Sequence, residues 1–169
     1  MVRRSGQDLS ATLVILVFRV SNRRLDIFVT DRASIEQGFL VRSAYALISI
    51  RDPDKRKVRA RRSPLLKATL ELAFHDAEPR TAFKLPENIR LINEEDAAQI
   101  WQFVRALSVE VKTVVVHCEQ GMSRSPAVAA ALCRGLGQDP ARFMTKYQPN
   151  AYVLRLITEA AGSLGSQRS

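Results

Sequence analysis

The residues best suited to chemistry lie between His117 and Pro126, a segment that reads His-Cys-Glu-Gln-Gly-Met-Ser-Arg-Ser-Pro. A β-branched run, Thr-Val-Val-Val-His, precedes it and predicts a buried strand, whereas the residues after it predict a helix. The strand therefore delivers Cys118 to a loop that opens directly into a helix. Backbone N–H groups at a helix N-terminus attract anions and favour a thiolate over a thiol. The segment predicts a nucleophilic cysteine beside an anion-binding loop.

The residues around Cys118 fit a phosphoryl group. Arg124 follows six positions later, at the expected helix start, where its planar fork can hold two phosphoryl oxygens. Ser125 can donate its hydroxyl to the sulfur and so ease departure of the thiolate in a second step. Gly121 can supply the left-handed turn that curls the loop around a tetrahedral anion. We expect His117 to lie behind the loop and to fix it through backbone hydrogen bonds.

This arrangement resembles the signature of the cysteine-dependent protein tyrosine phosphatase superfamily, His-Cys-x5-Arg-Ser/Thr. The Gly-x-Ser-Arg-Ser ending is most similar to the compact dual-specificity branch and its bacterial relatives, and the resemblance covers about residues 25–161. It implies a phosphocysteine intermediate on Cys118, released by water, with no metal or other cofactor. It also implies that Arg124 and the loop amides bind the phosphoryl oxygens, the loop residues being Glu119, Gln120, Gly121, Met122 and Ser123.

The resemblance further implies a general acid on a loop some distance before the cysteine. Asp76 lies 42 residues before Cys118, at the end of a predicted strand, where ligand sites of open α/β sheets form. We therefore expect Asp76 to protonate the leaving group. Glu78 is the main alternative, and a role of Asp76 as a simple turn former is also open.

The remaining elements indicate an α/β fold with a central, mostly parallel sheet flanked by helices. In this fold the phosphate-binding loop joins the last strand to a helix. Apolar runs predict strands over residues 12–20, 25–30, 46–50, 69–74 and 113–117. Helical spacing and capping residues predict helices over 94–107, 124–133, 140–147 and 151–162.

Length and composition indicate one globular domain in a chain of 169 residues with 46% hydrophobic content. The resemblance implies that the phosphatase domain covers residues 25–162. Residues 1–24 are expected to form an extension or extra strand, and 163–169 a loose tail. The apolar run 11–18 is shorter than the ~20 residues of a membrane span, and the arginines after it disfavour a secretion signal. Cys118 and Cys133 are too few for a disulfide framework, so we expect a reducing, cytoplasmic compartment.

The net charge of +9 favours anionic partners. Seven of the twelve residues from Arg51 to Arg62 are basic, and we call this segment the basic stretch. It is either a docking surface for an acidic partner or a solvated loop. It contains no aromatic residue for base stacking, which weakens the case for single-stranded nucleic acid.

The sequence thus favours a phosphomonoester hydrolase of the protein tyrosine or dual-specificity type. An RNA 5′-phosphatase of the same superfamily and a catalytically silent phosphate-binding module are the alternatives. Phosphoinositide phosphatases of this superfamily carry lysines within the loop, and this loop has Glu119, Gln120 and Met122 at those positions. We expect the Glu119 side chain to point away from the anion and to contribute only its amide.

Overall fold

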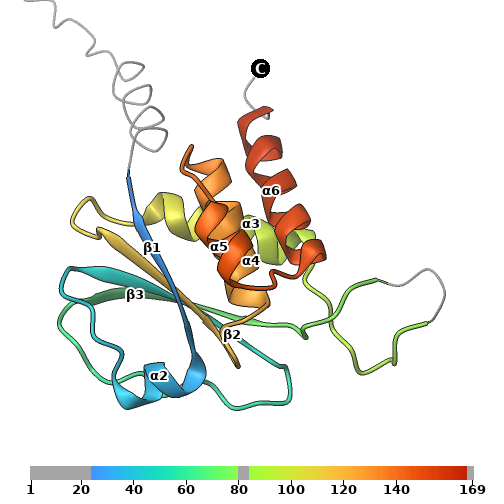
Figure 1. Ribbon diagram of the computed structural model, residues 1–169, viewed down its shortest axis with the longest axis horizontal. Coiled ribbons are helices and arrows are strands. Elements are labelled where there is room, and N and C mark those ends of the chain that lie inside the picture. The colour runs from blue at the N-terminus through green and yellow to red at the C-terminus, as the bar shows by residue number, and fades with distance from the viewer. Residues whose placement is uncertain (1–23, 80–83, 167–169) are drawn as a thin grey trace, which may run out of the picture.

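The chain folds around a four-stranded parallel sheet. The computed structural model describes residues 24–79 and 84–166, with side chains to residue 162 (Figure 1). The sheet order is β1-β4-β2-β3, where the strands are β1 (Asp26–Asp31), β2 (Tyr45–Arg51), β3 (Leu66–Ala73) and β4 (Thr113–Cys118). Each pair of neighbouring strands is parallel, which confirms the predicted fold class.

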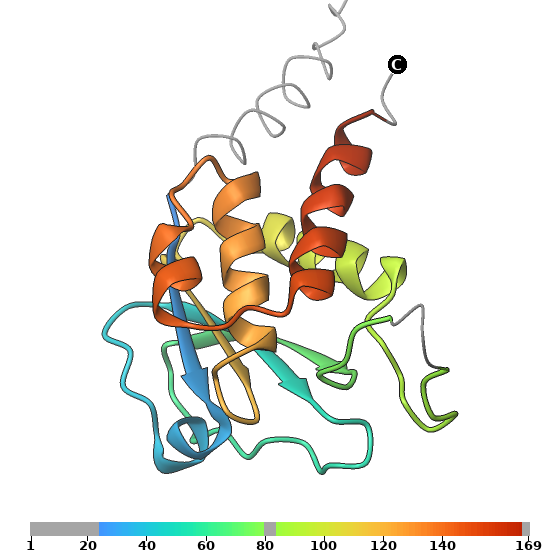
Figure 2. The same cartoon turned by 45° about the vertical axis from the view of Figure 1, so that its right-hand side comes forward.

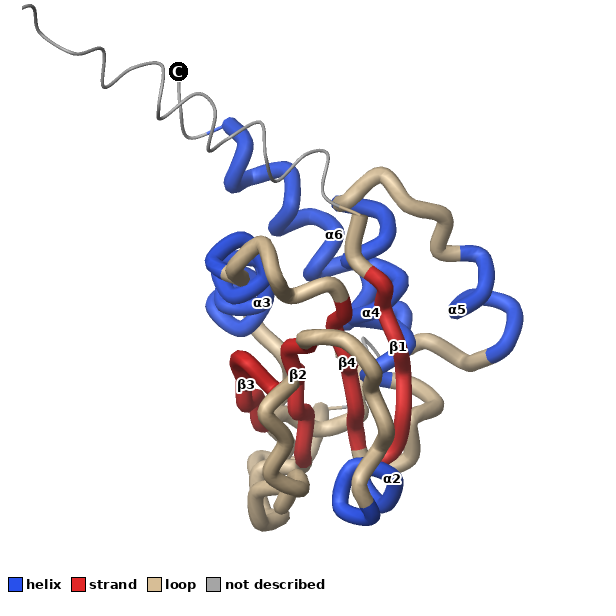
Figure 3. The backbone as a smooth tube through the Cα atoms, turned by 90° about the vertical axis from the view of Figure 1, so that its left-hand side faces the viewer, coloured by secondary structure: helices blue, strands red, loops and turns tan. Residues whose placement is uncertain are grey.

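Four of the five described helices gather on one face of the sheet. The helices are α2 (Arg32–Gln37), α3 (Glu94–Ala106), α4 (Arg124–Gly135), α5 (Ala141–Lys146) and α6 (Ala151–Ser166). Helices α3 to α6 lie together over the sheet, whereas α2 lies apart from them at the end of β1 (Figures 2 and 3). Within the described residues, no helix has the length and apolar character that a membrane span requires.

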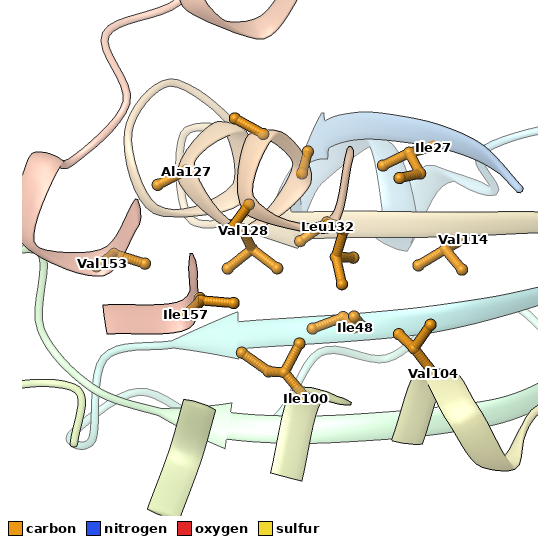
Figure 4. Close-up of a cluster of buried hydrophobic side chains, with 14 of the residues drawn as sticks. Ile27, Ile48, Ile100, Val104, Val114, Ala127, Val128, Leu132, Val153 and Ile157 are labelled. Atoms are coloured by element: carbon orange, nitrogen blue, oxygen red, sulfur yellow. The ribbon is translucent and has the colours of Figure 1, made fainter. Parts of the chain in front are cut away.

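The central strands are buried on both faces, which explains their continuous apolar sequences. On the face toward the helices, Ile48 of β2 packs in one cluster with Ile100 of α3, Leu132 of α4 and Ile157 of α6 (Figure 4). A smaller cluster covers the opposite face and joins Ile35 of α2 to Tyr45, Leu47 and Val115. Cys118 belongs to the helix-side cluster, so a packed core supports the base of the loop.

Local capping explains where the helix before β4 begins. Asn93 accepts from the backbone N–H of Asp96 at 2.9 Å, and the Asp96 carboxylate accepts from that of Asn93 at 3.1 Å, which is a capping box. Arg90 holds the same carboxylate through one nitrogen at 2.9 and 3.0 Å. The predicted start of this helix after Asn93 is confirmed.

The described elements differ from the sequence prediction in two places. Helix α2 was not predicted, because six residues are too short to show a helical period, although Asp31 caps it and Gly38 ends it at φ 96°. Helix α6 continues to Ser166 rather than ending near 162, since a helical glycine such as Gly162 costs only about 1 kcal/mol. The tail predicted as loose is therefore helical over 163–166, while the strand predicted over 12–20 lies outside the described residues.

A buried polar pair links the two central strands directly behind the loop. His117 is 1% exposed, and its Nε2 lies 2.8 Å from the hydroxyl of Ser49 on β2. Its Nδ1 lies 3.4 Å from the carbonyl oxygen of Cys118, where it can only donate. Burial lowers the pKa of His117 below its ordinary value, because a charged imidazolium would lose its hydration.

This pKa shift predicts a loss of stability in mild acid. The unfolded chain binds a proton at His117 near pH 6.5, whereas the folded chain resists it, so the stabilisation is complete above that pH. As the pH falls below 6.5, the free energy of unfolding should drop by up to about 1.4 kcal/mol per pH unit through this residue. Urea unfolding between pH 7.5 and 5.5 should show a steeper decline for the wild type than for His117→Gln.

Ser49→Ala is the matched control for this measurement. It removes the hydrogen-bond partner but leaves the buried imidazole, so it should be less stable at each pH and keep the wild-type decline. Equal declines for the wild type and His117→Gln would contradict the assignment.

Candidate active site

The loop from Cys118 to Arg124 joins the end of β4 to the first turn of α4, as the sequence predicted. The Cys118 side chain is almost fully buried, and two donors face its sulfur. The backbone N–H of Gly121 points at Sγ at 3.2 Å, and the hydroxyl of Ser125 lies 3.1 Å from it. Each of these two groups can donate a hydrogen bond to the sulfur.

Gly121 allows the loop to turn beneath the end of β1. Its φ is +68°, and a Cβ at this position would lie 2.8 Å from the carbonyl oxygen of Thr30. Both the left-handed backbone and the close approach exclude other residues. The requirement for glycine therefore comes from a neighbouring strand as well as from the local turn.

Arg124 is 4% exposed, and residues that directly follow two strands of the sheet hold one nitrogen of its guanidinium. Its Nη1 donates to the Asp52 carboxylate at 2.7 Å and to the carbonyl of Phe74 at 2.6 Å. Its buried Nε has no hydrogen-bond partner within the described residues. The guanidinium is thus held by groups that directly follow β2 and β3.

Asp52 is the site residue that sequence reasoning missed. It lies within the basic stretch, which was considered only for its positive charge. Its place immediately after β2 was the available signal, because parallel strands end at a common edge where ligand sites form.

Asp76 and Glu78 lie in different surroundings. Asp76 is exposed beside the loop, and its Oδ1 accepts from the Ser123 hydroxyl at 2.8 Å and from the Asn150 amide at 2.9 Å. Glu78 instead accepts from the backbone N–H of Ala151 at 2.9 Å, at the start of α6. Only Asp76 of the two lines the cavity above Cys118.

That cavity has a volume of about 360 Å³ and brings most of the predicted site residues together. Its described lining consists of Asp52, His75, Asp76, Ala77, Ile89, Cys118, Glu119, Gln120, Met122, Ser123 and Arg124. Of the side chains in this lining, only Arg124 is permanently cationic. The described residues contain no group of three His, Cys, Asp or Glu side chains that could hold a metal ion.

His75, which precedes Asp76, also lines the cavity. Its Nδ1 accepts a hydrogen bond from the backbone N–H of Arg90 at 3.0 Å. In a neutral imidazole the proton then resides on Nε2, the other ring nitrogen.

The structure adds a side-chain partner to two of the loop expectations. His117 was expected to fix the loop through backbone hydrogen bonds; its Nδ1 lies 3.4 Å from the Cys118 carbonyl oxygen, and its shorter contact, at 2.8 Å, is to the side chain of Ser49. Glu119 was expected to point its side chain away from the anion and to contribute only its amide; its carboxylate forms an ion pair with Arg32 at 3.0 Å, while the residue lines the cavity.

The basic stretch divides into two halves. In the first half, Arg51 donates to three backbone carbonyls, Arg56 pairs with Glu36, and Lys57 pairs with Glu71. In the second half the side chains of three exposed arginines have no ion-pair or hydrogen-bond partner among residues 24–79 and 84–166: Arg59, Arg61 and Arg62. Arg61 and Arg62 line a second cavity of about 180 Å³ beside apolar side chains of Phe39, Leu40 and Val41.

Comparison with known proteins gives matches among solved structures only. No known family profile and no curated protein sequence matches the chain. The human tyrosine phosphatase-like serine/threonine/tyrosine-interacting protein aligns with 17% identity and a TM-score of 0.54, over 83% of this chain and 93% of that one. PTPMT1 in complex with PI(5)P aligns with 12% identity and a TM-score of 0.52, over 85% and 95%. Human DUSP28 aligns with 23% identity and a TM-score of 0.48, over 83% and 94%.

The first two likenesses extend over more than four-fifths of the chain. They agree with the parallel sheet and with the strand–loop–helix unit that carries the His-Cys-x5-Arg-Ser signature. The chain therefore shares its fold with this tyrosine phosphatase-like protein and with PTPMT1.

Proposed function

We propose that this chain is a cysteine-dependent phosphatase that hydrolyses phosphomonoesters, with proteins as its substrate class. The observation that carries this proposal is the placement of Cys118 at the base of a cavity, with the Gly121 N–H and the Ser125 hydroxyl facing its sulfur. The free Nε of Arg124 supports it, because a buried donor without a partner fits an incoming anion.

The reaction has two steps. In the first, the Cys118 thiolate attacks phosphorus while the P–O bond to the leaving group breaks, and Asp76 protonates the departing oxygen. Arg124 and the loop N–H groups bind the phosphoryl oxygens. In the second, water attacks the phosphocysteine and gives a proton to the Asp76 carboxylate, while the S–P bond breaks and inorganic phosphate is released. The Ser125 hydroxyl stabilises the departing thiolate by a hydrogen bond.

Asp76 is favoured over Glu78 as the acid because of where the two carboxyl groups lie. The Asp76 Oδ1 accepts two hydrogen bonds, while its Oδ2 has no partner within the described residues and can carry the proton. Glu78 instead accepts a hydrogen bond from the backbone N–H of Ala151 at the start of α6, and it is not among the described residues that line the cavity.

The charge of the cavity favours a substrate with a single phosphate. PTPMT1 was crystallised with a phosphoinositide. In this chain, however, no lysine is among the described residues that line the cavity, so a second phosphate would meet carboxylates rather than cations. An RNA 5′-phosphatase and a silent phosphate-binding module are the alternatives. A preference for 5′-phosphorylated RNA would favour the first, and anion binding without turnover would favour the second.

Replacement of the nucleophile separates catalysis from binding. Cys118→Ser should lower turnover of p-nitrophenyl phosphate at least a thousandfold, because a serine hydroxyl is a far weaker nucleophile than a thiolate. It should still bind tungstate, since Arg124 and the loop amides remain, as isothermal titration calorimetry can measure. If Cys118→Ser keeps a tenth of wild-type activity, the mechanism is wrong; if the wild type binds tungstate without turnover, the silent module is favoured.

Asp76→Asn and Glu78→Gln form a matched pair for the acid. With phenyl phosphate, whose leaving group needs a proton, Asp76→Asn should lower kcat by about 10²–10⁴. The loss should shrink with p-nitrophenyl phosphate, because that leaving group departs more readily without protonation. Glu78→Gln should keep kcat for both substrates and lower only stability. The reverse pattern would move the acid to Glu78.

The divided basic stretch gives a test for an acidic partner. Replacing Arg59, Arg61 and Arg62 by glutamine should lower kcat/KM at least threefold for an acidic phosphopeptide at low salt. The loss should fade as salt rises, because exposed charges are screened over ~10 Å at 0.1 M. Turnover of p-nitrophenyl phosphate should stay unchanged, since that substrate is too small to reach beyond the cavity.

The matched control replaces Arg56 and Lys57, which already have acidic partners within the fold. This control should change kcat/KM for the phosphopeptide less than the triple variant does. A larger loss with 5′-phosphorylated RNA than with the peptide, and with a steep salt dependence, would instead favour the RNA 5′-phosphatase. No loss with either substrate would make the stretch a solvated loop.

A further inference from the structure

Glu119 places an acidic side chain in the loop that is proposed to bind an anion. The residue follows Cys118 directly and lines the same cavity as Arg124. An unpaired carboxylate there would repel both a thiolate and a phosphoryl group. A site that binds anions therefore needs a cationic group that offsets the charge of this carboxylate or holds the carboxylate away from the anion.

Arg32 contacts Glu119 twice. Its Nη1 donates to the Glu119 carboxylate at 3.0 Å, and its backbone N–H donates to the Glu119 carbonyl at 3.3 Å. The parallel register of β1 and β4 creates this meeting, because Asp31 pairs with Cys118 and so brings the next residues of both segments side by side. The two side chains are only 14% and 25% exposed, which limits screening of the pair by solvent.

Further contacts hold the Arg32 guanidinium in place, so the side chain cannot easily rotate away from Glu119. Its Nη2 donates to the carbonyls of Arg56 and Lys57 at 2.9 and 3.3 Å. Its Nε lies 3.3 Å from the carboxylate of Glu36, one turn along α2. All three side-chain nitrogens of Arg32 therefore have acceptors, which fixes the plane of its guanidinium.

Glu36 is kept charged by its own surroundings. Arg56 donates to this carboxylate, and this hydrogen bond, with smaller effects from other neighbours, lowers the pKa of Glu36 below its ordinary value. The anchor that holds Arg32 in place thus consists of α2 and the segment after β2, and neither belongs to the phosphate-binding loop.

We propose that Arg32 is a positioning residue that holds the Glu119 carboxylate away from the anion and offsets its charge, and so raises the affinity of the loop for a phosphoryl group. This role rests on the proposed phosphatase function of the same loop. It assigns to α2 a task in substrate binding, although no residue of α2 lines the cavity.

A double-mutant cycle tests the role. Arg32→Gln should raise both the tungstate Kd and the KM for p-nitrophenyl phosphate about threefold to tenfold, as expected for one uncompensated charge near an anion. Its kcat should stay within twofold, because the loop geometry and the acid are retained. In the Glu119→Gln background the same substitution should change the tungstate Kd and the KM less than twofold, since no carboxylate is left to control.

Two further variants separate charge control from structural support. Arg32→Lys keeps the positive charge and should recover most of the tungstate affinity that Arg32→Gln loses. Glu36→Gln loosens the anchor of Arg32 but keeps the positive charge beside Glu119, so it should raise the tungstate Kd less than Arg32→Gln does. Thermal unfolding of each variant confirms that it remains folded under the conditions used.

The outcomes are distinct. If Arg32→Gln weakens tungstate binding equally with and without the Glu119 carboxylate, Arg32 only supports the fold and the proposal is overturned. If it has no effect in either background, the ion pair is irrelevant to anion binding and the proposal is again overturned. A wild type that binds tungstate but turns over no phosphomonoester would refute the phosphatase function instead, while the calorimetric cycle would still report on Arg32.

Discussion

Four parallel strands end at one edge of the sheet, and the site depends on that alignment. Cys118 ends β4, Arg32 and Asp52 directly follow β1 and β2, and Phe74 directly follows β3. Because the strands are parallel and in register, these residues meet although up to 86 positions separate them in the sequence. In an antiparallel strand the C-terminal end, and the residues that follow it, would lie at the opposite end of the sheet.

The cavity beside the loop after β4 is lined by three described carboxylates, and each of them has a partner. Asp52 is paired with Arg124, Glu119 with Arg32, and Asp76 with hydroxyl and amide donors. Buried or partly buried charges without partners would weaken both folding and anion binding. The two arginines differ in how they are held: among the described residues Arg124 keeps one buried N–H without a partner, whereas each side-chain nitrogen of Arg32 lies near an acceptor or an ion-pair partner.

Rigid support comes from two sides of the loop. The helix-side core includes Cys118 itself, and the buried His117–Ser49 pair ties β4 to β2 behind it. Gly121 fits beneath Thr30 with no room for a side chain. A loop held in this way keeps its N–H groups in one arrangement, which is the preorganisation that the proposed reaction requires.

Local sequence determined the elements and the reactive segment of this protein. The run Thr-Val-Val-Val-His, the glycine within the loop and the capping residue Asn93 each act over a few positions, so their consequences could be read directly from the chain. Tertiary structure decided which distant charges meet. Nothing near Asp52 or Arg32 in the sequence indicates Arg124 or Glu119 as a partner, because strand order and register set those distances and depend on packing of the whole sheet.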